Sequence, residues 1–148
     1  MLPKENWAQL IPHQGAMCLL DTVIDYDAMH LHARSATQTD PKNPLRTDGR
    51  LHAIALCEYG AQAMAVHGAL RSREAGGRAR PGFLVALREV QLHVEYVEDL
   101  RGELDVYAEQ LLDAGSSLQY AFRIEHHGRV LASGRAAVLT AANGETDP

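Results

Sequence analysis

One carboxylate stands inside an apolar stretch of the chain. Residues 51–70 read LHAIALCEYGAQAMAVHGAL, and Glu58 is the one acidic residue among them. A helix over this stretch would be apolar on almost every side and therefore buried. A buried carboxylate is costly unless another group pairs with it or a reaction uses it. Glu58 is therefore the first candidate for a general acid.

Three other polar side chains are candidates to act with Glu58. Gln62 lies four residues further on, so a helix places it one turn away on the same face, where it can orient Glu58. His52 opens the stretch, but six residues separate it from Glu58 by about 120° around a helix axis. His13 lies in the earlier segment IPHQGAMCLL. Of the two imidazoles we favour His52 over His13 as a base, because it is nearer in sequence.

Histidine and cysteine also raise the question of a metal site. His30 and His32 alternate on one predicted strand face and have the spacing of two ligands. No third ligand accompanies them in the sequence, so we interpret them as part of a solvated face and expect no metal. Cys18 and Cys57 lie in apolar contexts, which indicates reduced core residues.

Strands on either side of one helix must position these residues. A hairpin is predicted over residues 17–36, with Met29, Leu31 and Ala33 on its buried face. A loop over residues 37–50 follows, in which Thr47 or Asp48 can cap the helix at 51–70. A four-strand antiparallel meander is predicted over residues 83–140, and 141–148 are expected to form a frayed tail. The fold class is therefore α+β, a single domain over residues 1–148 in which a curved antiparallel sheet wraps one long helix. Such a sheet leaves open edges, which favours a dimer.

Composition narrows the possible partners. The 148 residues carry a formal charge of -5, which disfavours nucleic-acid binding. The first ten residues contain no apolar leader. A membrane span over residues 51–70 would put Glu58 and Gln62 in lipid, so we expect no membrane insertion and a cytoplasmic location.

Several short motifs, taken in order, resemble those of one enzyme family. They are IPH at residues 11–13, MCLLDTV at 17–23, EYGAQ at 58–62, VEDLRG at 97–102 and the turn at 126–128. Their order and spacing are similar to those of the β-hydroxyacyl-(acyl carrier protein) dehydratases, which have the hot-dog fold. The chain most resembles the small dehydratase-like proteins of bacterial aryl-polyene pigment synthesis.

The resemblance implies a reaction and roles for particular residues. In this family a histidine removes the α-proton beside a thioester carbonyl, and an acid on the central helix protonates the departing β-hydroxyl. A backbone N–H at the start of the helix polarises the thioester oxygen. Glu58 matches the acid, and Gln62 is expected to orient Glu58 or the thioester. The histidine and the acid come from different protomers, so the resemblance implies a homodimer or a heterodimer with a related protein.

The resemblance also implies how the substrate is carried. The acyl chain is attached to the phosphopantetheine of acyl carrier protein, and loss of water requires no metal or redox cofactor. Arg71, Arg73, Arg78 and Arg80 form a basic cluster in an acidic protein. One interpretation is a solvated loop. The other is a docking patch for an acidic carrier, with Arg78 and Arg80 near the phosphate.

The family's catalytic histidine is missing from its expected place. That residue lies in the loop just before the helix, where this chain reads NPLRTDGR over residues 43–50 and has Pro44 at the corresponding position. One hypothesis is a dehydratase in which Glu58 is the acid and His52 or His13 is the base. Another is a degenerate subunit that pairs with an active dehydratase or only binds acyl thioesters. A thioesterase is a third interpretation.

Overall fold

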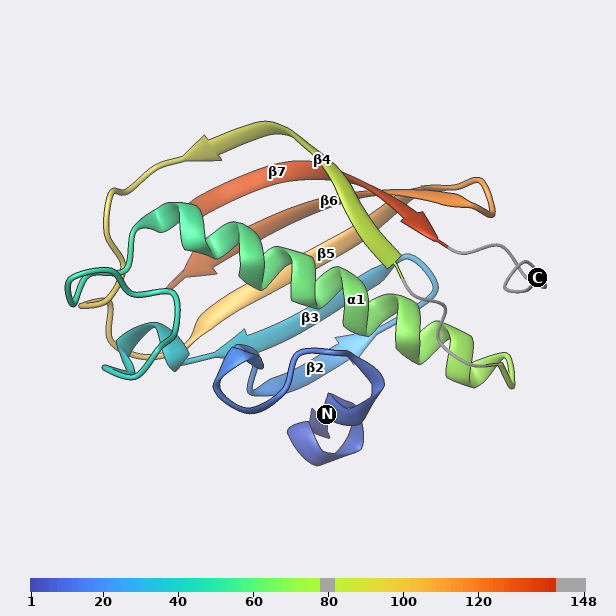
Figure 1. The fold of residues 1–148 in the computed structure, drawn as a ribbon, viewed down its shortest axis with the longest axis horizontal. Coiled ribbons are helices and arrows are strands. Elements are labelled where there is room, and N and C mark those ends of the chain that lie inside the picture. The colour runs from blue at the N-terminus through green and yellow to red at the C-terminus, as the bar shows by residue number, and fades with distance from the viewer. Residues whose placement is uncertain (78–81, 141–148) are drawn as a thin grey trace.

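A long helix lies across one face of a curved antiparallel sheet (Figure 1). The computed structural model describes residues 1–77 and 82–140. Within these residues helix α1 spans Leu56–Glu74, and the sheet has seven strands. The strands are β1 (Leu2–Pro3), β2 (Thr22–Tyr26), β3 (His30–Ser35), β4 (Gly82–Leu92), β5 (Leu104–Asp113), β6 (Ser117–His126) and β7 (Arg129–Thr140). Short 3-10 turns are η1 (Lys4–Asn6), η2 (Ala8–Leu10), η3 (Gly15–Met17), η4 (Thr37–Thr39) and η5 (Ala53–Ala55). The α+β class predicted from the sequence is confirmed, while the predicted tail at 141–148 lies outside the described residues.

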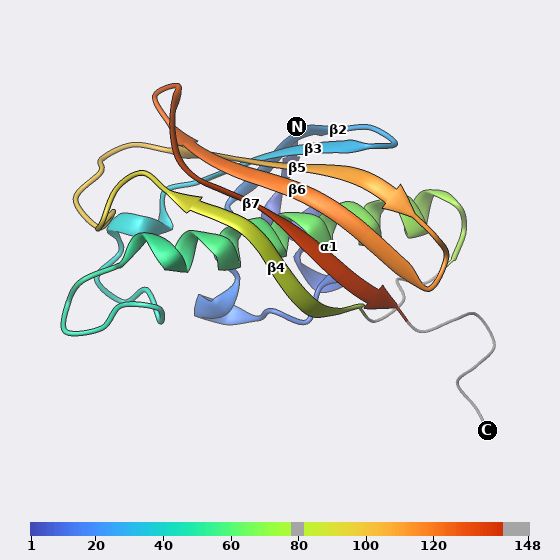
Figure 2. The same cartoon turned by 90° about the horizontal axis from the view of Figure 1, so that it is seen from above.

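The strand order differs from the predicted meander. The strands pair in the order β1-β2-β3-β5-β6-β7-β4, so β4 lies at an edge beside β7, and β5 pairs with β3 (Figure 2). The segment between β4 and β5 runs past the residues that precede α1. There the Val97 N–H donates to Leu51 O at 2.9 Å, and the Ala53 N–H donates to Glu95 O at 2.8 Å. The meander prediction is wrong because alternation along a strand specifies its buried face but not its neighbours.

Helix α1 begins and ends later than predicted. His52 is extended, with φ -70° and ψ 146°, and its ring nitrogen accepts a hydrogen bond from the Ile54 N–H. His52, rather than Thr47 or Asp48, therefore caps the turn η5 that leads into α1. At the other end the helix continues to Glu74, whose carboxylate accepts a 2.6 Å hydrogen bond from the Tyr26 hydroxyl on β2.

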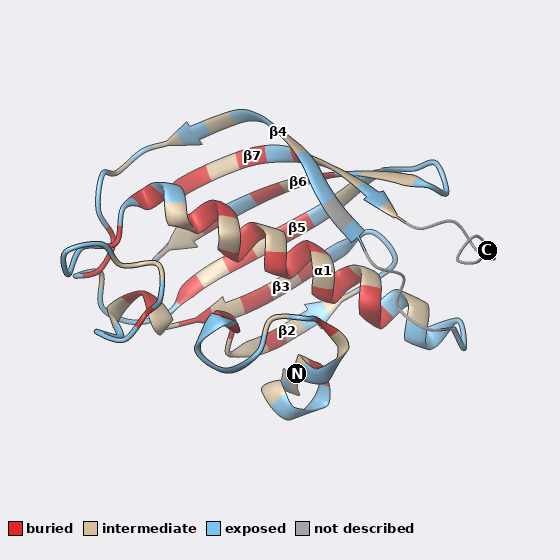
Figure 3. Ribbon diagram, in the orientation of Figure 1, coloured by how far each residue is buried: buried red, intermediate tan, exposed pale blue. Residues whose placement is uncertain are grey.

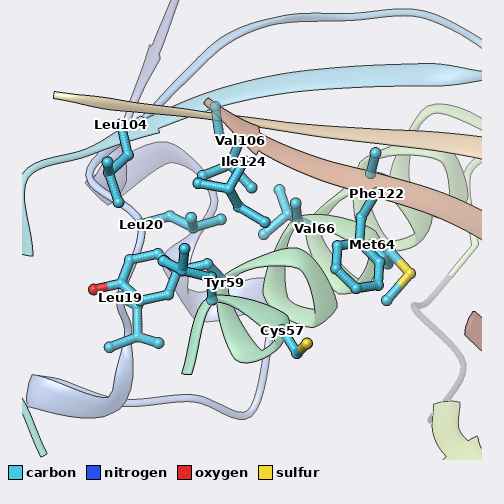
Figure 4. Close-up of a cluster of buried hydrophobic side chains, with 14 of the residues drawn as sticks. Leu19, Leu20, Cys57, Tyr59, Met64, Val66, Leu104, Val106, Phe122 and Ile124 are labelled. Carbon is cyan, nitrogen blue, oxygen red and sulfur yellow. The ribbon is translucent and has the colours of Figure 1, made fainter. Parts of the chain in front are cut away.

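The core lies between α1, the sheet and the N-terminal segment. Figure 4 shows helix side chains meeting those of the sheet and of residues that precede β2. Trp7 is fully buried, and the neighbouring turn η2 contacts α1. The buried side chains labelled in the close-up are Leu19, Leu20, Cys57, Tyr59, Met64, Val66, Leu104, Val106, Phe122 and Ile124. The helix is therefore covered from two sides, which suits its apolar sequence.

One stripe of α1 is less deeply buried than the sequence suggested. Glu58, Ala61, Ala65 and Gly68 follow one another at helical spacing, and all four have intermediate exposure (Figure 3). All of them except Glu58 are small. The expectation of a helix buried all round is thus wrong along this stripe, and the acid lies on it.

Two glycines of α1 differ in what surrounds them. A Cβ added to Gly60 would lie 2.6 Å from Cδ2 and 2.7 Å from Cγ of Phe122, whereas a Cβ at Gly68 would meet nothing within 4 Å. We predict that Gly60→Ala lowers the free energy of unfolding by about 1–3 kcal/mol, because the Phe122 ring must move. Gly68→Ala, the matched control, should raise it by up to about 1 kcal/mol through helix propensity. Urea denaturation of both variants checks this pair, and equal effects would contradict it.

His67 is a buried histidine on the side of α1 away from the exposed stripe. Its Nδ1 lies 2.7 Å from the Tyr120 hydroxyl, and its Nε2 lies 3.0 Å from Asp27 O. Because a carbonyl only accepts, Nε2 carries the proton and Nδ1 accepts from Tyr120. Desolvation by burial lowers the pKa of His67 below its ordinary value of 6.5. The imidazole is therefore held neutral in the folded protein.

This histidine should make stability depend on pH. The unfolded chain binds a proton at His67 near pH 6.5 but the folded chain does not, so stability is lost as pH falls below about 6.5. The slope is at most about 1.4 kcal/mol per pH unit for this one group. We predict that His67→Gln flattens the decline in unfolding free energy between pH 7.5 and 5.5, and that His93→Gln, at an exposed position, does not. A decline that is unchanged in His67→Gln would exclude this origin.

Candidate active site

The structure brings His13 next to Glu58. Nε2 of His13 lies 3.4 Å from Oε1 of Glu58, and the two side chains are 25% and 37% exposed. Glu58 comes from the first turn of α1, and His13 comes from the segment between η2 and η3. An imidazole and a carboxylate at this distance, both open to solvent, have the geometry of an acid–base pair. The preference for His52 over His13, which rested on distance along the chain, does not fit this geometry.

His52 has a different environment. Its Nδ1 accepts the Ile54 N–H at 3.0 Å, and its ring meets that of Tyr96 edge-on, with centroids 5.5 Å apart. Together with Leu45 and Arg50 it lines a cavity of about 330 Å³ whose lining does not include Glu58. His52 is therefore not the imidazole in front of this chain's own acid.

Gln62 is fully buried and faces the N-terminal segment. Its Nε2 donates to Met17 O at 2.7 Å, and its Oε1 accepts from the Leu19 N–H at 2.8 Å. The expected role of orienting Glu58 or a thioester does not fit, because the amide is occupied by the main chain. A sequence reading could place Gln62 on the face of Glu58 but could not show which segment covers that face.

The predicted basic cluster is described only in part. Arg78 and Arg80 lie outside the described residues. Arg71 donates to Glu74 Oε1 at 2.9 Å, and Arg73 donates to Asn6 O at 3.1 Å. Arg71 is therefore paired within α1, and Arg73 is bonded to η1 of the N-terminal segment.

The loop before the helix has a structural use in this chain. Pro44, at the position expected for the family histidine, is exposed, whereas its neighbour Asn43 is buried. The Asn43 amide donates to Thr37 O and to the Tyr59 hydroxyl, each at 3.0 Å. The Tyr59 hydroxyl also lies 2.8 Å from Thr37 Oγ1. Asn43 thus braces the loop against α1, a role that its sequence context did not signal.

The backbone donors at the start of the helix region are also occupied. The Leu51 N–H donates to Glu98 Oε1 at 2.9 Å, the Ala53 N–H to Glu95 O at 2.8 Å, and the Ala55 N–H to His52 O at 2.9 Å. The Ile54 N–H is bonded to the His52 ring, as above. The N–H that the family resemblance led us to expect as a donor to a thioester oxygen is therefore not available at Leu51 or at residues 53–55.

The remaining candidates are structural. Burial raises the pKa of the Cys18 and Cys57 thiols, which disfavours a nucleophilic thiolate. Nε2 of His32 lies 2.7 Å from Asp105 Oδ1, and the His32 ring stacks on Tyr107 on the outer face of the sheet. Within residues 1–77 and 82–140, no three histidine, cysteine or acidic side chains form a metal-binding group. In the same part of the chain no helix is long and apolar enough to cross a membrane.

Comparison with known proteins gives a family and a fold. The ApeP-like family model, described as ApeP dehydratase, matches residues 5–147. The chain is similar to a structure described as the dehydratase heterocomplex ApeI:P from Xenorhabdus doucetiae, with 26% identity, a TM-score of 0.82, and coverage of 98% of this chain and 95% of that chain. No curated protein matches the chain.

Two more distant structures support the fold alone. A thioesterase from Haemophilus influenzae has 11% identity, a TM-score of 0.71 and coverage of 100% of this chain and 96% of that chain. A conserved protein from Pseudomonas aeruginosa has 18% identity, a TM-score of 0.64 and coverage of 90% and 98%. Together with the sheet and helix described above, these matches identify the hot-dog fold.

Proposed function

Because the chain belongs to the ApeP-like dehydratase family, we propose that it dehydrates 3-hydroxyacyl thioesters attached to acyl carrier protein, with Glu58 as the general acid. The observation that carries the residue assignment is the 3.4 Å approach of His13 to Glu58. In this proposal His13 supplies the imidazole that is missing from the loop before α1.

The reaction needs one base and one acid. Neutral His13 takes the α-proton, and the electrons of that C–H bond form the Cα–Cβ double bond. The C–O bond at Cβ breaks as Glu58 donates its proton to the leaving hydroxyl, which departs as water. The product is a trans-2-enoyl thioester. His13 then carries the substrate's α-proton and Glu58 is deprotonated, and their proximity allows His13 to pass this proton to Glu58, which restores both groups. No electrons are gained or lost overall, so the proposal requires no redox cofactor.

A second candidate function is a subunit that supplies only the acid. Three observations favour it: Pro44 stands in place of the loop histidine, the N–H groups at Leu51 and residues 53–55 are bonded, and the chain resembles a dehydratase heterocomplex. The edge strand β4 exposes Leu84, Val85 and Leu87, which suits pairing with a related hot-dog chain. In this case Glu58 completes a site whose histidine belongs to the partner.

Turnover by single-residue variants separates the two candidates. We predict that Glu58→Gln lowers dehydration of a 3-hydroxyacyl–carrier thioester by about 10²–10⁴-fold in either case. If His13 is the base, His13→Gln causes a similar loss in the purified protein. If a partner supplies the base, the protein alone is inactive, and the mixture with the partner tolerates His13→Gln but not Glu58→Gln. The measurement is enoyl-thioester formation followed by mass spectrometry.

Matched controls are available on the outer face of the sheet and beyond β4. Glu109→Gln removes an exposed acid, and His93→Gln removes an exposed imidazole. Both variants should keep the parent rate. Full activity in Glu58→Gln would overturn the proposal, and release of free acid without dehydration would indicate the thioesterase instead.

The carrier can be tested through the basic residues after α1. We propose that Arg78 and Arg80 attract the acidic carrier and its phosphate, so Arg78→Ala/Arg80→Ala should raise KM for the carrier-bound substrate. The KM for the same acyl group on free pantetheine should not change. Added salt should raise the KM of the parent protein for the carrier-bound substrate, and it should raise that of the variant less. An unchanged KM and salt dependence would exclude this docking role.

A further inference from the structure

We propose that Gln62 is a positioning residue whose buried amide fixes the segment that carries His13 and thereby holds the imidazole against Glu58. This inference rests on the proposed function, because it concerns how the acid and base are brought together. It differs from a role toward Glu58 or substrate, since the amide contacts neither carboxylate nor open space.

The contacts of Gln62 reproduce the hydrogen bonding of a neighbouring strand. Its side chain is fully buried. One end of the amide donates to Met17 O at 2.7 Å and the other accepts the Leu19 N–H at 2.8 Å. The two main-chain groups belong to residues two apart, as in a strand pair. The amide of Gln62 and the two main-chain groups therefore satisfy one another's hydrogen bonding.

Apart from the Gln62 contacts, the segment around His13 is bonded mainly to itself, as where Gln14 Nε2 donates to Ile11 O at 3.1 Å and the Met17 N–H donates to Gln14 O at 3.2 Å. Residues 14–17 are exposed, and they turn through Gly15, whose φ is +59°. Ile11, two residues before His13, is buried and anchors one end of the segment. The Gln62 contacts anchor the other end. His13 lies between these two anchors.

No direct hydrogen bond fixes the imidazole itself. Nδ1 of His13 is buried and has no hydrogen-bond partner in the described part of the chain. Nε2 is the nitrogen near Glu58. The ring therefore takes its place from the path of the backbone, and that path depends on the anchors. Displacement of a reacting group by about 1 Å can cost about 10²-fold in rate.

The helix links this anchor to the acid. Gln62 follows Glu58 by one turn, so both project from the same side of a rigid element. A segment bound to Gln62 is thus placed relative to Glu58 without a contact to that carboxylate. Glutamine is suited to the position because its amide both donates and accepts, whereas a carboxylate only accepts and leucine does neither.

Two substitutions of Gln62 separate the effect of its donor from that of its acceptor. Gln62→Glu keeps the acceptor for the Leu19 N–H but loses the donor to Met17 O. Gln62→Leu loses both. Gln119, on β6, is exposed, so Gln119→Glu and Gln119→Leu are matched controls that leave the core unchanged. The folded state of each variant is checked by near-ultraviolet circular dichroism.

The experiment combines amide hydrogen exchange, ring contacts by nuclear magnetic resonance, and dehydration kinetics. In Gln62→Leu we expect the Leu19 amide to lose its protection, the His13 ring to lose its nuclear Overhauser contact with Glu58, and kcat to fall by about 10–100-fold with KM unchanged. Gln62→Glu should retain Leu19 protection and lose part of the ring contact and of kcat. The Gln119 variants should match the parent protein in all three measurements.

The inference is overturned if Gln62→Leu loses Leu19 protection while the His13–Glu58 contact and kcat remain at parent values. It is also overturned if KM rises and kcat does not fall, since that would indicate substrate binding. The magnetic resonance measurements do not require turnover. If Glu58→Gln and His13→Gln leave dehydration intact, the proposed function fails, but the ring contact still decides whether Gln62 positions His13.

Discussion

The structure depends on covering a helix that is mostly apolar from Leu56 to Leu70. The sheet covers one side of α1, and a single antiparallel layer must curve to do so. The other side is covered by the N-terminal segment, which contributes Trp7 and Leu19 to the core. The remaining stripe from Glu58 to Gly68 stays partly exposed. Burial of one helix therefore dictates both the shape of the sheet and the path of the first twenty residues.

The same constraint explains where the proposed acid–base pair lies. An acid on a fully buried helix face would need a buried partner. An acid at the edge of the N-terminal segment that covers the helix can contact both the protein and a substrate. Glu58 lies at that boundary, and His13 lies at the margin of the segment that forms the cover. The pair is thus a consequence of how the N-terminal segment packs, and Gln62 is the polar group at which that packing is fixed.

The sequence predicted where the strands lie along the chain better than it predicted which strands pair. Alternation correctly placed Leu31 and Ala33 of β3 inside, but Met29, expected on the same face, precedes β3 and is exposed. The last strand was predicted with its observed bounds, Arg129–Thr140. Alternation could not reveal that β5 pairs with β3, because pairing is decided by the connection that crosses the start of the helix. The start of α1 was also missed. His52 is held extended by an antiparallel bridge to Tyr96, which is more than forty residues away in the sequence.

The candidate site was predicted in part for the same reason. Glu58 could be singled out as a candidate because a lone carboxylate in an apolar stretch is visible in the sequence. His13 was ranked below His52 because distance along the chain was the available guide, whereas the fold brings residue 13 to residue 58. The contacts of Gln62 were missed because its partners are backbone groups, which carry no signal in residue type.

The loop before α1, which has Pro44 where the family resemblance led us to expect a histidine, still contacts the helix that carries Glu58. Asn43 and Tyr59 turn the loop before α1 into a brace, and the hydrogen bonds of this brace reach the first turn of the helix, next to Glu58. A fixed first turn is useful to either candidate function, because a general acid must be held within a fraction of an ångström of its productive position. If His13 is the base, the brace and Gln62 hold the two ends of one pair. If a partner supplies the base, the brace presents Glu58 to it. Exposure of Glu58 on a rigid helix is therefore the property of this chain that both functions require.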